Sequence, residues 1–275
     1  MILALAAAIV VGVTALAVAA MLLVRRRAPE GSYFEDGDRA SGVFGVLSTA
    51  FAIVLGFVVF LTFANYDTSR AGAEAEARLV AQQFETAQFL SDSTGAELSG
   101  QLVCYGRWVV EGEWPQMESG NLVERINPWN IAMFETLRSE EPGTAAQEAA
   151  YGKWLDQTSD REQARADRLY GVTGVLPTPL WIALFLTGGL VFGYMLFFAD
   201  SRERWTSQAM LMGTVAIVVA SMFVLLWFLD NPYHGGFGSL QPTAMERMLE
   251  LVDEAILVVG EVEIPCDERG TPRSG

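Results

Sequence analysis

The sequence predicts an all-α integral membrane protein with four transmembrane helices and a helical domain outside the membrane. Four stretches carry no charged residue, and each is longer than the roughly 20 residues that cross a bilayer. A soluble core helix of this length rarely lacks a polar face. No strand pattern or internal repeat stands out. The four uncharged stretches are 1–24, 40–66, 169–199 and 205–229.

We therefore expect transmembrane helices at about 3–24, 43–65, 180–199 and 207–229. The alternative for the first stretch is a cleaved signal peptide. Such a peptide carries its positive charges before the apolar run and ends in a small-residue cleavage site. Here the arginines 25-RRR-27 follow the run. This order favours a retained anchor whose N-terminus lies outside.

The arginines also predict the topology. The 25–41 loop carries four arginines, and the short 200–206 loop carries Arg202 and Arg204. Two crossings separate these loops, so both lie on one side, which positive-inside bias makes the cytoplasm. We therefore expect a multi-pass protein of the plasma membrane with both termini extracytoplasmic. The expected segments are 1–65 (two membrane helices and an arginine loop), 66–178 (acidic outer domain), 179–229 (two membrane helices) and 230–275 (acidic outer tail).

The net charge of −15 is confined to the two outer segments. Residues 66–178 hold 18 acidic against 9 basic residues, and the tail from Asp230 holds 9 against 3. The two inner loops balance, at 6 against 6. Such a face repels nucleic acid and attracts cations. No basic stripe of the kind that nucleic-acid binding needs is present, so we expect no nucleic-acid partner.

The outer domain reads as helical. Residues 67–90 are rich in Ala, Glu and Gln and extend the second membrane helix outward. A second outer helix runs from about 96 to 111. Its apolar stripe at helical spacing consists of Leu98, Leu102, Tyr105 and Val109.

Capping patterns predict where the later helices begin. Asn127 followed by Pro128 favours a helix start, and this helix ends before 142-PG-143. Thr144 with Gln147 three residues on is a capping-box pattern for a helix that continues towards Tyr170. An amphipathic helix follows Pro242 in the tail.

Small residues recur every four positions in each membrane helix, a pattern that lets helices approach closely in lipid. One interpretation is packing inside a single four-helix unit, and the other is a subunit interface. The stripes are Ala4, Ala8 and Gly12; Ser48, Ala52 and Gly56; Gly189 and Gly193; and Ala216 and Ala220.

Few residues suggest a catalytic or metal-binding role. No Walker, Rossmann, zinc or nucleophile-elbow pattern occurs, and His234, the only histidine, lies in a Gly-rich loop. Glu111 and Glu113 are two positions apart and would face different sides of a helix, so they form no acid pair. The segment 112-GEWP-115 reads as a helix end with solvated or capping charges. We expect no catalytic residue, metal or cofactor, and the chain is not expected to be an enzyme.

The predicted spans contain no ionisable residue, which argues against proton pumps and ion-coupled transporters. A pore would have to be lined by hydroxyls, backbone and apolar gates. The candidates are Ser48, Thr49 and Thr62, although such residues also bond back to their own helix.

The two cysteines, Cys104 and Cys266, both lie outside in this topology, where disulfides persist. An even pair favours a bridge, with two free buried thiols as the alternative. Cys104, Trp108 and Glu111 share one helix face and could meet the tail. A bridge would clamp the tail onto the outer domain.

Three stretches resemble a family of bacterial membrane proteins labelled "bestrophin-like domain". They are 105-YGRWVVEGEWPQM-117, 168-RLYGVTGVLPTPLW-181 and 229-LDNPYHGGFGSLQP-242. The residues that carry the resemblance are Tyr105, Glu113, Trp114, Pro115, Pro232 and Gly235. The resemblance implies a four-helix membrane protein. The label suggests an oligomeric channel like the bestrophins, which are anion channels with their bulk in the cytoplasm.

Two functional interpretations follow. The sequence favours a non-catalytic membrane protein that presents an acidic outer domain, as a scaffold, sensor or accessory subunit. The alternative is a homo-oligomeric channel-like protein that is cation-selective or weakly selective, because the acidic face would lower the anion concentration at a pore mouth. The expected partners are the lipid bilayer and either further copies of the chain or another membrane protein.

Overall fold

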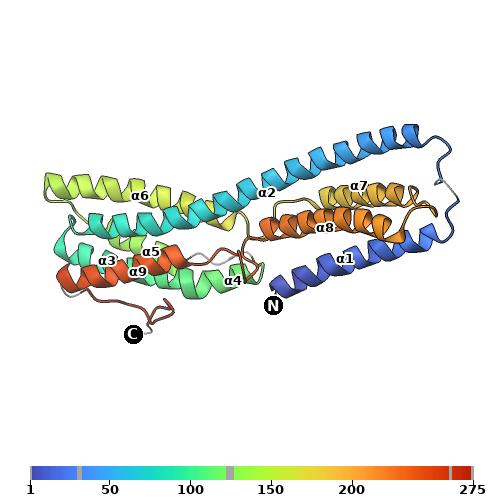
Figure 1. Cartoon of the computed structure of the whole chain (residues 1–275). Coiled ribbons are helices and arrows are strands. Elements are labelled where there is room, and N and C mark those ends of the chain that lie inside the picture. The colour runs from blue at the N-terminus through green and yellow to red at the C-terminus, as the bar shows by residue number, and fades with distance from the viewer. Residues whose placement is uncertain (1, 30–32, 122–126, 260–261, 274–275) are drawn as a thin grey trace. The chain divides into compact units, whose positions relative to one another are not determined.

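A computed structural model of the chain describes residues 2–29, 33–121, 127–259 and 262–273 (Figure 1). The described residues form helices and no strand, apart from a single bridge between Cys266 and Pro272. The helices are α1 (Ile2–Arg25), α2 (Gly37–Ala87), α3 (Asp92–Trp108), the π-helix η1 (Val109–Glu113), α4 (Trp114–Glu118), α5 (Pro128–Arg138), α6 (Ala145–Leu169), α7 (Thr178–Leu196), α8 (Trp205–Asp230) and α9 (Thr243–Val259).

The contacts divide the chain into two compact units. Unit 1 comprises Met1–Ala64, Val175–Asp230 and Gly236–Gly238, and unit 2 comprises Asn65–Gly174, Asn231–Gly235 and Ser239–Gly275. The 51-residue helix α2 contributes to both units without a break.

Unit 1 contains the membrane spans. Among the described residues, four helices are long and apolar enough to cross a bilayer, namely Leu3–Arg25, Gly37–Ala87, Thr178–Leu196 and Trp205–Asp230. This confirms the predicted fold class. The second helix continues far beyond the predicted span because no breaker stronger than Gly72 interrupts it. Its membrane half packs through Phe51, Leu55 and Val58 against Leu184 of α7 and Leu226 of α8.

The two arginine-bearing loops meet at one end of unit 1. Arg25 donates hydrogen bonds to the carbonyl oxygens of Ser201 at 3.1 Å and Glu203 at 2.6 Å. Aromatic rings gather at the same end, where Phe34 stacks on Tyr194 with ring centroids 5.4 Å apart. The loops therefore lie on one side, as two intervening crossings require.

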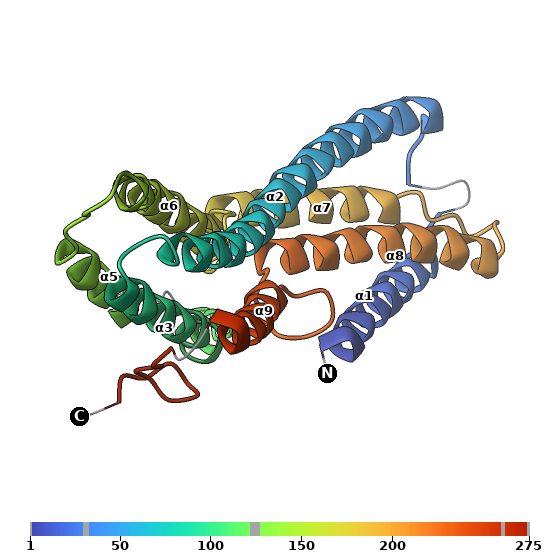
Figure 2. The same cartoon turned by 90° about the vertical axis from the view of Figure 1, so that its left-hand side faces the viewer.

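Unit 2 encloses a core between the outer half of α2 and the helices α3 to α6 and α9. The predicted stripe of the second outer helix faces inward, because Leu98, Leu102, Tyr105 and Val109 are all 0% exposed. Figure 2 shows α9 beside α3. Met245 and Met248 of α9 are buried in the same core.

The predicted helix starts are confirmed. The Asn127 side chain accepts a hydrogen bond from the Trp129 backbone N–H at 3.1 Å and caps α5. Thr144 and Gln147 form both bonds of a capping box at the start of α6. Each cap satisfies helix N–H groups that have no partner within the helix.

The expectation of a helix end at 112-GEWP-115 is wrong. The chain passes from α3 through η1 into α4, and the Trp114 N–H donates to the Val109 carbonyl five residues back. Pro115 lies in the first turn of α4. Proline lacks an N–H and crowds the carbonyl four residues before it, and the wider π turn accommodates this without ending the helix.

The small-residue stripes of the membrane helices differ in whether they are buried within unit 1. Ala216 and Ala220 are buried within unit 1 and pack as the single-unit interpretation predicts. The other stripes contain glycines at which an added Cβ would meet nothing within 4 Å, namely Gly12, Gly56, Gly189 and Gly193. At these glycines the helix surface is left open by the part of the chain that the structure describes.

Candidate functional site

Residues of the family motifs converge on a buried charged network in unit 2. The Arg168 guanidinium of α6 bonds to Glu76 of α2 through Nε and Nη2, the latter at 3.1 Å, and to Glu113 of η1 at 2.6 Å. The Tyr105 hydroxyl donates to Glu76 at 2.5 Å. Arg165 donates to the second oxygen of Glu113 at 3.0 Å. The network thus joins α2, α3, η1 and α6.

Glu113 of the π-helix belongs to this network. It lies four residues after the buried Val109, on the same side of the helix. It is 0% exposed, whereas Glu111 is exposed. The expectation that Glu113 is a solvated or capping charge is therefore wrong. Short π segments often occur at functional positions.

Burial and pairing fix the charge states of the network. Burial alone would lower the pKa of Arg168, but the Glu76 and Glu113 carboxylates raise that pKa well above its ordinary value. Burial, followed by the charge of Glu76, raises the pKa of the Tyr105 hydroxyl well above its ordinary value. Arg168 stays charged and Tyr105 stays neutral at physiological pH.

A second buried guanidinium lies beside the network. Arg161 bonds to Gln83 of α2 at 2.5 Å and to Asn130 of α5 at 3.0 Å, and it lies over the Tyr105 ring at 4.7 Å. Its partners are neutral groups, so cation–π attraction and amide oxygens stabilise this charge. These contacts join α5 to α2 and α6.

The remaining motif residues connect the loop after α8 to the network. The Tyr233 hydroxyl donates to the Arg168 carbonyl at 2.6 Å, and its ring meets Trp114 edge to face at 5.5 Å. Pro232 is buried, and its carbonyl accepts from Leu240 at 2.8 Å. Gly235 adopts φ +62°, a conformation that favours glycine. Of the motif residues, Pro115 alone is exposed.

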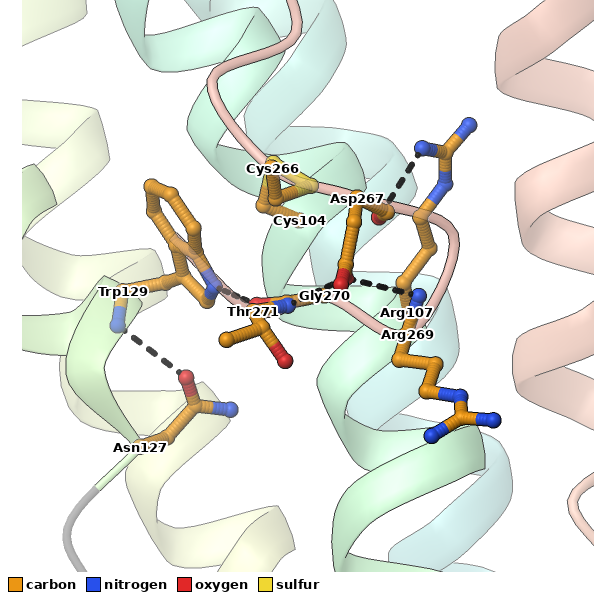
Figure 3. The surroundings of a disulfide bond; sticks show 9 residues. All are labelled: Cys104, Arg107, Asn127, Trp129, Cys266, Asp267, Arg269, Gly270 and Thr271. Atoms are coloured by element: carbon orange, nitrogen blue, oxygen red, sulfur yellow. Dashed lines mark hydrogen bonds between the residues drawn. A yellow bond between two sulfur atoms is a disulfide. The ribbon is translucent and has the colours of Figure 1, made fainter. Parts of the chain in front are cut away.

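The structure joins Cys104 of α3 to Cys266 of the tail by a disulfide, in agreement with the sequence prediction (Figure 3). Both cysteines are fully buried, and their Cα atoms are 5.8 Å apart. Trp108, on the same face of α3, also lies against the tail through Gly270. The bridge connects positions 162 residues apart in the chain.

Hydrogen bonds hold the turn that follows the disulfide. The Trp129 indole N–H donates to the Gly270 carbonyl at 2.7 Å (Figure 3). The Asp267 side chain accepts from the backbone N–H groups of Arg269 and Thr271 and closes the turn. Residues 262–273 therefore pack as part of unit 2.

The membrane half of α2 has two opposite faces. One is the packed face of Phe51, Leu55, Val58 and Thr62. The other, the exposed α2 face, consists of Val46, Thr49, Ile53, Phe57 and Phe60. Thr62 is buried and bonds to its own helix, and Ser48 is half-buried and does the same. Of the three pore-lining candidates, Thr49 lies on the exposed α2 face.

The sequence reasoning missed Glu76, Arg161 and Arg168. Glu76 lies four residues before the buried Val80, and Arg168 and Arg161 are seven residues apart on one face of α6. Their helical spacing relative to buried apolar residues was the signal in the sequence that could have indicated their burial.

Among the described residues, no group of three His, Cys, Asp or Glu side chains is placed to hold a metal ion. The carboxylates of the network are instead bonded by guanidinium groups. We interpret the network as a structural junction of the helices.

Comparison with known proteins identifies the family. A profile described as "Bestrophin-like domain" matches residues 11–245. Comparison with curated proteins found no match.

Solved structures share the fold. A point variant of a bacterial bestrophin homologue from Klebsiella pneumoniae superposes with a TM-score of 0.66 at 13% identity, covering 91% of this chain and 98% of that one. A second variant of the homologue gives a TM-score of 0.68 at 14% identity, covering 92% and 99%. A structure titled as a membrane protein variant superposes with a TM-score of 0.66 at 14% identity and covers 92% of this chain and 99% of that one.

Proposed function

The chain belongs to the bestrophin-like domain family, and we propose from this that its copies assemble around an axis as an ion channel. The family and the fold favour this alternative over a scaffold, sensor or accessory subunit. The proposal assigns no catalytic role to the chain, because the buried carboxylates are already paired with arginines.

The observation that carries the proposal is the exposed α2 face. Its residues recur at intervals of three or four and lie opposite the packed face. One continuous stripe of α2 is thus left without partners among the described residues. Gly42, Gly45 and Gly56 adjoin the stripe, and a Cβ at each would meet nothing within 4 Å. A ring of subunits could bring the same stripe of each copy to a shared axis.

The composition of this face suits a pore with an apolar gate. Thr49 supplies a hydroxyl, and Ile53, Phe57 and Phe60 follow along the same stripe. Apolar constrictions close pores by excluding water. The absence of ionisable residues from the spans is compatible with this kind of gate.

The charge of the outer segments predicts the ion selectivity of such a pore. The outer segments hold the whole net charge of −15 of each copy. In an assembly this charge would concentrate cations and repel anions near the outer mouth. We propose a cation-selective or weakly selective pore.

The proposed orientation places unit 2 outside the cytoplasm. The arginine loops at one end of unit 1 support this through positive-inside bias. The buried Cys104–Cys266 disulfide supports it separately, because such bonds persist in the oxidising periplasm.

Conductance of the purified protein in planar bilayers tests the channel. We expect a measurable conductance that Ile53→Thr increases, because a hydroxyl makes an apolar constriction easier to wet. Ile182→Thr is the matched control, since Ile182 of α7 is equally exposed, at 62% against 67%. It should leave the conductance unchanged.

The same recordings test selectivity through the reversal potential in a salt gradient. Chloride selectivity would contradict the electrostatic argument. Absence of conductance in both wild type and Ile53→Thr, together with a monomeric mass in detergent, would restore the scaffold interpretation.

A further inference from the structure

Unit 1 contains an apolar groove between α1, α7 and α8, with a volume of about 540 Å³. Leu5 and Ile9 of α1 form one wall. Phe185 and Gly189 of α7 and Phe223 of α8 form the others. The volume lies within the usual range of ligand pockets, roughly 300–1,000 Å³.

Stacked aromatic rings and an open glycine position define the shape of the groove. Phe185 stacks on Phe223 with centroids 4.9 Å apart and on Trp181 at 5.7 Å, which makes a flat aromatic wall. A Cβ added at Gly189 would meet nothing within 4 Å, so glycine here leaves the space open. Larger residues at this position would narrow the groove.

The groove is continuous with the membrane-facing surface of the spans. Its rim residues Leu5, Ile9 and Phe185 are 61%, 48% and 60% exposed. All its described walls belong to helices that are apolar enough to cross the bilayer. The medium at its mouth is therefore hydrocarbon.

We propose that this groove binds one acyl chain of a membrane phospholipid. None of its described lining residues is charged, and a polar ligand would lose its hydrogen bonds to water without replacement. A hydrocarbon chain loses none.

The two ends of the groove differ and set the orientation of the lipid. Trp181 and Trp227 line one end, and the Trp181 indole N–H points to Asp230, the last residue of α8, at 3.4 Å. Asp230 also accepts from the backbone N–H of Val175 at 2.8 Å. Tryptophans mark the membrane–water boundary, so the lipid headgroup lies at this end and the chain runs inward past Gly189. The site does not depend on ion conduction.

Fluorescence of the full-length protein tests the site. The background variant combines Trp205→Phe with Trp227→Phe, which removes the tryptophan at the start of α8 and the one that is 43% exposed near its end, so that Trp181 reports on the groove. The protein is placed in vesicles of phosphatidylcholine with brominated acyl chains, which quench tryptophans in contact with them. We expect strong quenching, and Gly189→Leu in this background should remove most of it by filling the groove.

Gly193→Leu is the matched control. Gly193 lies one turn further along α7, its Cβ position is equally open, and it does not line the groove. It should keep the quenching. Native mass spectrometry gives an independent readout, in which wild type and Gly193→Leu retain a phospholipid that Gly189→Leu loses.

Three outcomes would overturn the proposal. They are absence of quenching in the background variant, equal quenching in both glycine variants, and retention of the same lipid by all proteins. Disulfide formation and elution volume show that each variant is folded. If quenching is absent and two copies of the chain can be cross-linked through α1, the groove is occupied by a second copy of the protein instead of a lipid.

Discussion

At the scale of single residues, Arg168 pairs with two buried carboxylates of unit 2. It bonds to two carboxylates, Glu76 and Glu113, and all three side chains are 0% exposed. Removing such charges from water is costly, and their mutual attraction offsets the cost only when the pairing is complete. Loss of one partner leaves a buried charge without compensation.

We therefore expect Arg168→Met to lower the free energy of unfolding by about 3–5 kcal/mol. The measurement is thermal unfolding of the purified protein in detergent. The control is Arg70→Met, because Arg70 also pairs with a glutamate of α2, Glu74, but both side chains are exposed, at 61% and 57%. Exposed pairs contribute little, so this variant should melt like wild type. Equal melting of the two variants would contradict the assigned role of Arg168.

At the scale of elements, a glycine in α3 allows the backbone of the tail to approach the helix closely. A Cβ at Gly100 would lie 2.0 Å from the Glu263 carbonyl oxygen, a distance that no side chain tolerates. Glu263 and Pro265 immediately precede Cys266. Close approach at Gly100 therefore positions the tail for the disulfide one turn further along α3.

Gly100→Ala should displace the tail and lower the fraction of molecules with the Cys104–Cys266 bond. Alkylation of the unreduced, denatured protein followed by mass spectrometry measures that fraction. Gly152→Ala in α6 is the control, because its added Cβ meets nothing within 4 Å. Alanine there favours the helix by up to about 1 kcal/mol. An unchanged linked fraction in Gly100→Ala would show that the tail contact does not guide the bond.

These elements also show what local patterns could predict. The caps at Asn127 and Thr144 depend on neighbours within three residues, so the sequence located both helix starts. The burial of Glu113 was missed because 112-GEWP-115 was interpreted as a helix end, whereas the chain continues through η1 into α4. Arg168 was missed because its partners lie 55 and 92 residues away.

For the whole molecule, the open question is which side of the membrane holds unit 2. The resemblance to bestrophins implies the cytoplasm. Arg25 contacting the 200–206 loop places the arginine clusters together at one end of unit 1, and positive-inside bias puts that end in the cytoplasm. An odd number of crossings separates either cluster from residues 66–178, so we propose that this long segment is extracytoplasmic. The disulfide argues in the same direction because reducing cytoplasm does not sustain such a bond.

Reporter fusions to the full chain decide this orientation. A fluorescent protein that folds only in the cytoplasm, fused after Gly275, should stay dark. The same reporter inserted in the 200–206 loop should fluoresce, which controls for expression and membrane insertion. The dark fusion is expected because, in the proposed orientation, α8 leads from the cytoplasmic side near Arg204 to the outer side at Asp230. The reporter would then be exported unfolded. Fluorescence after Gly275 with a dark loop fusion would reverse the molecule, place unit 2 in the cytoplasm and leave its disulfide without an oxidising compartment.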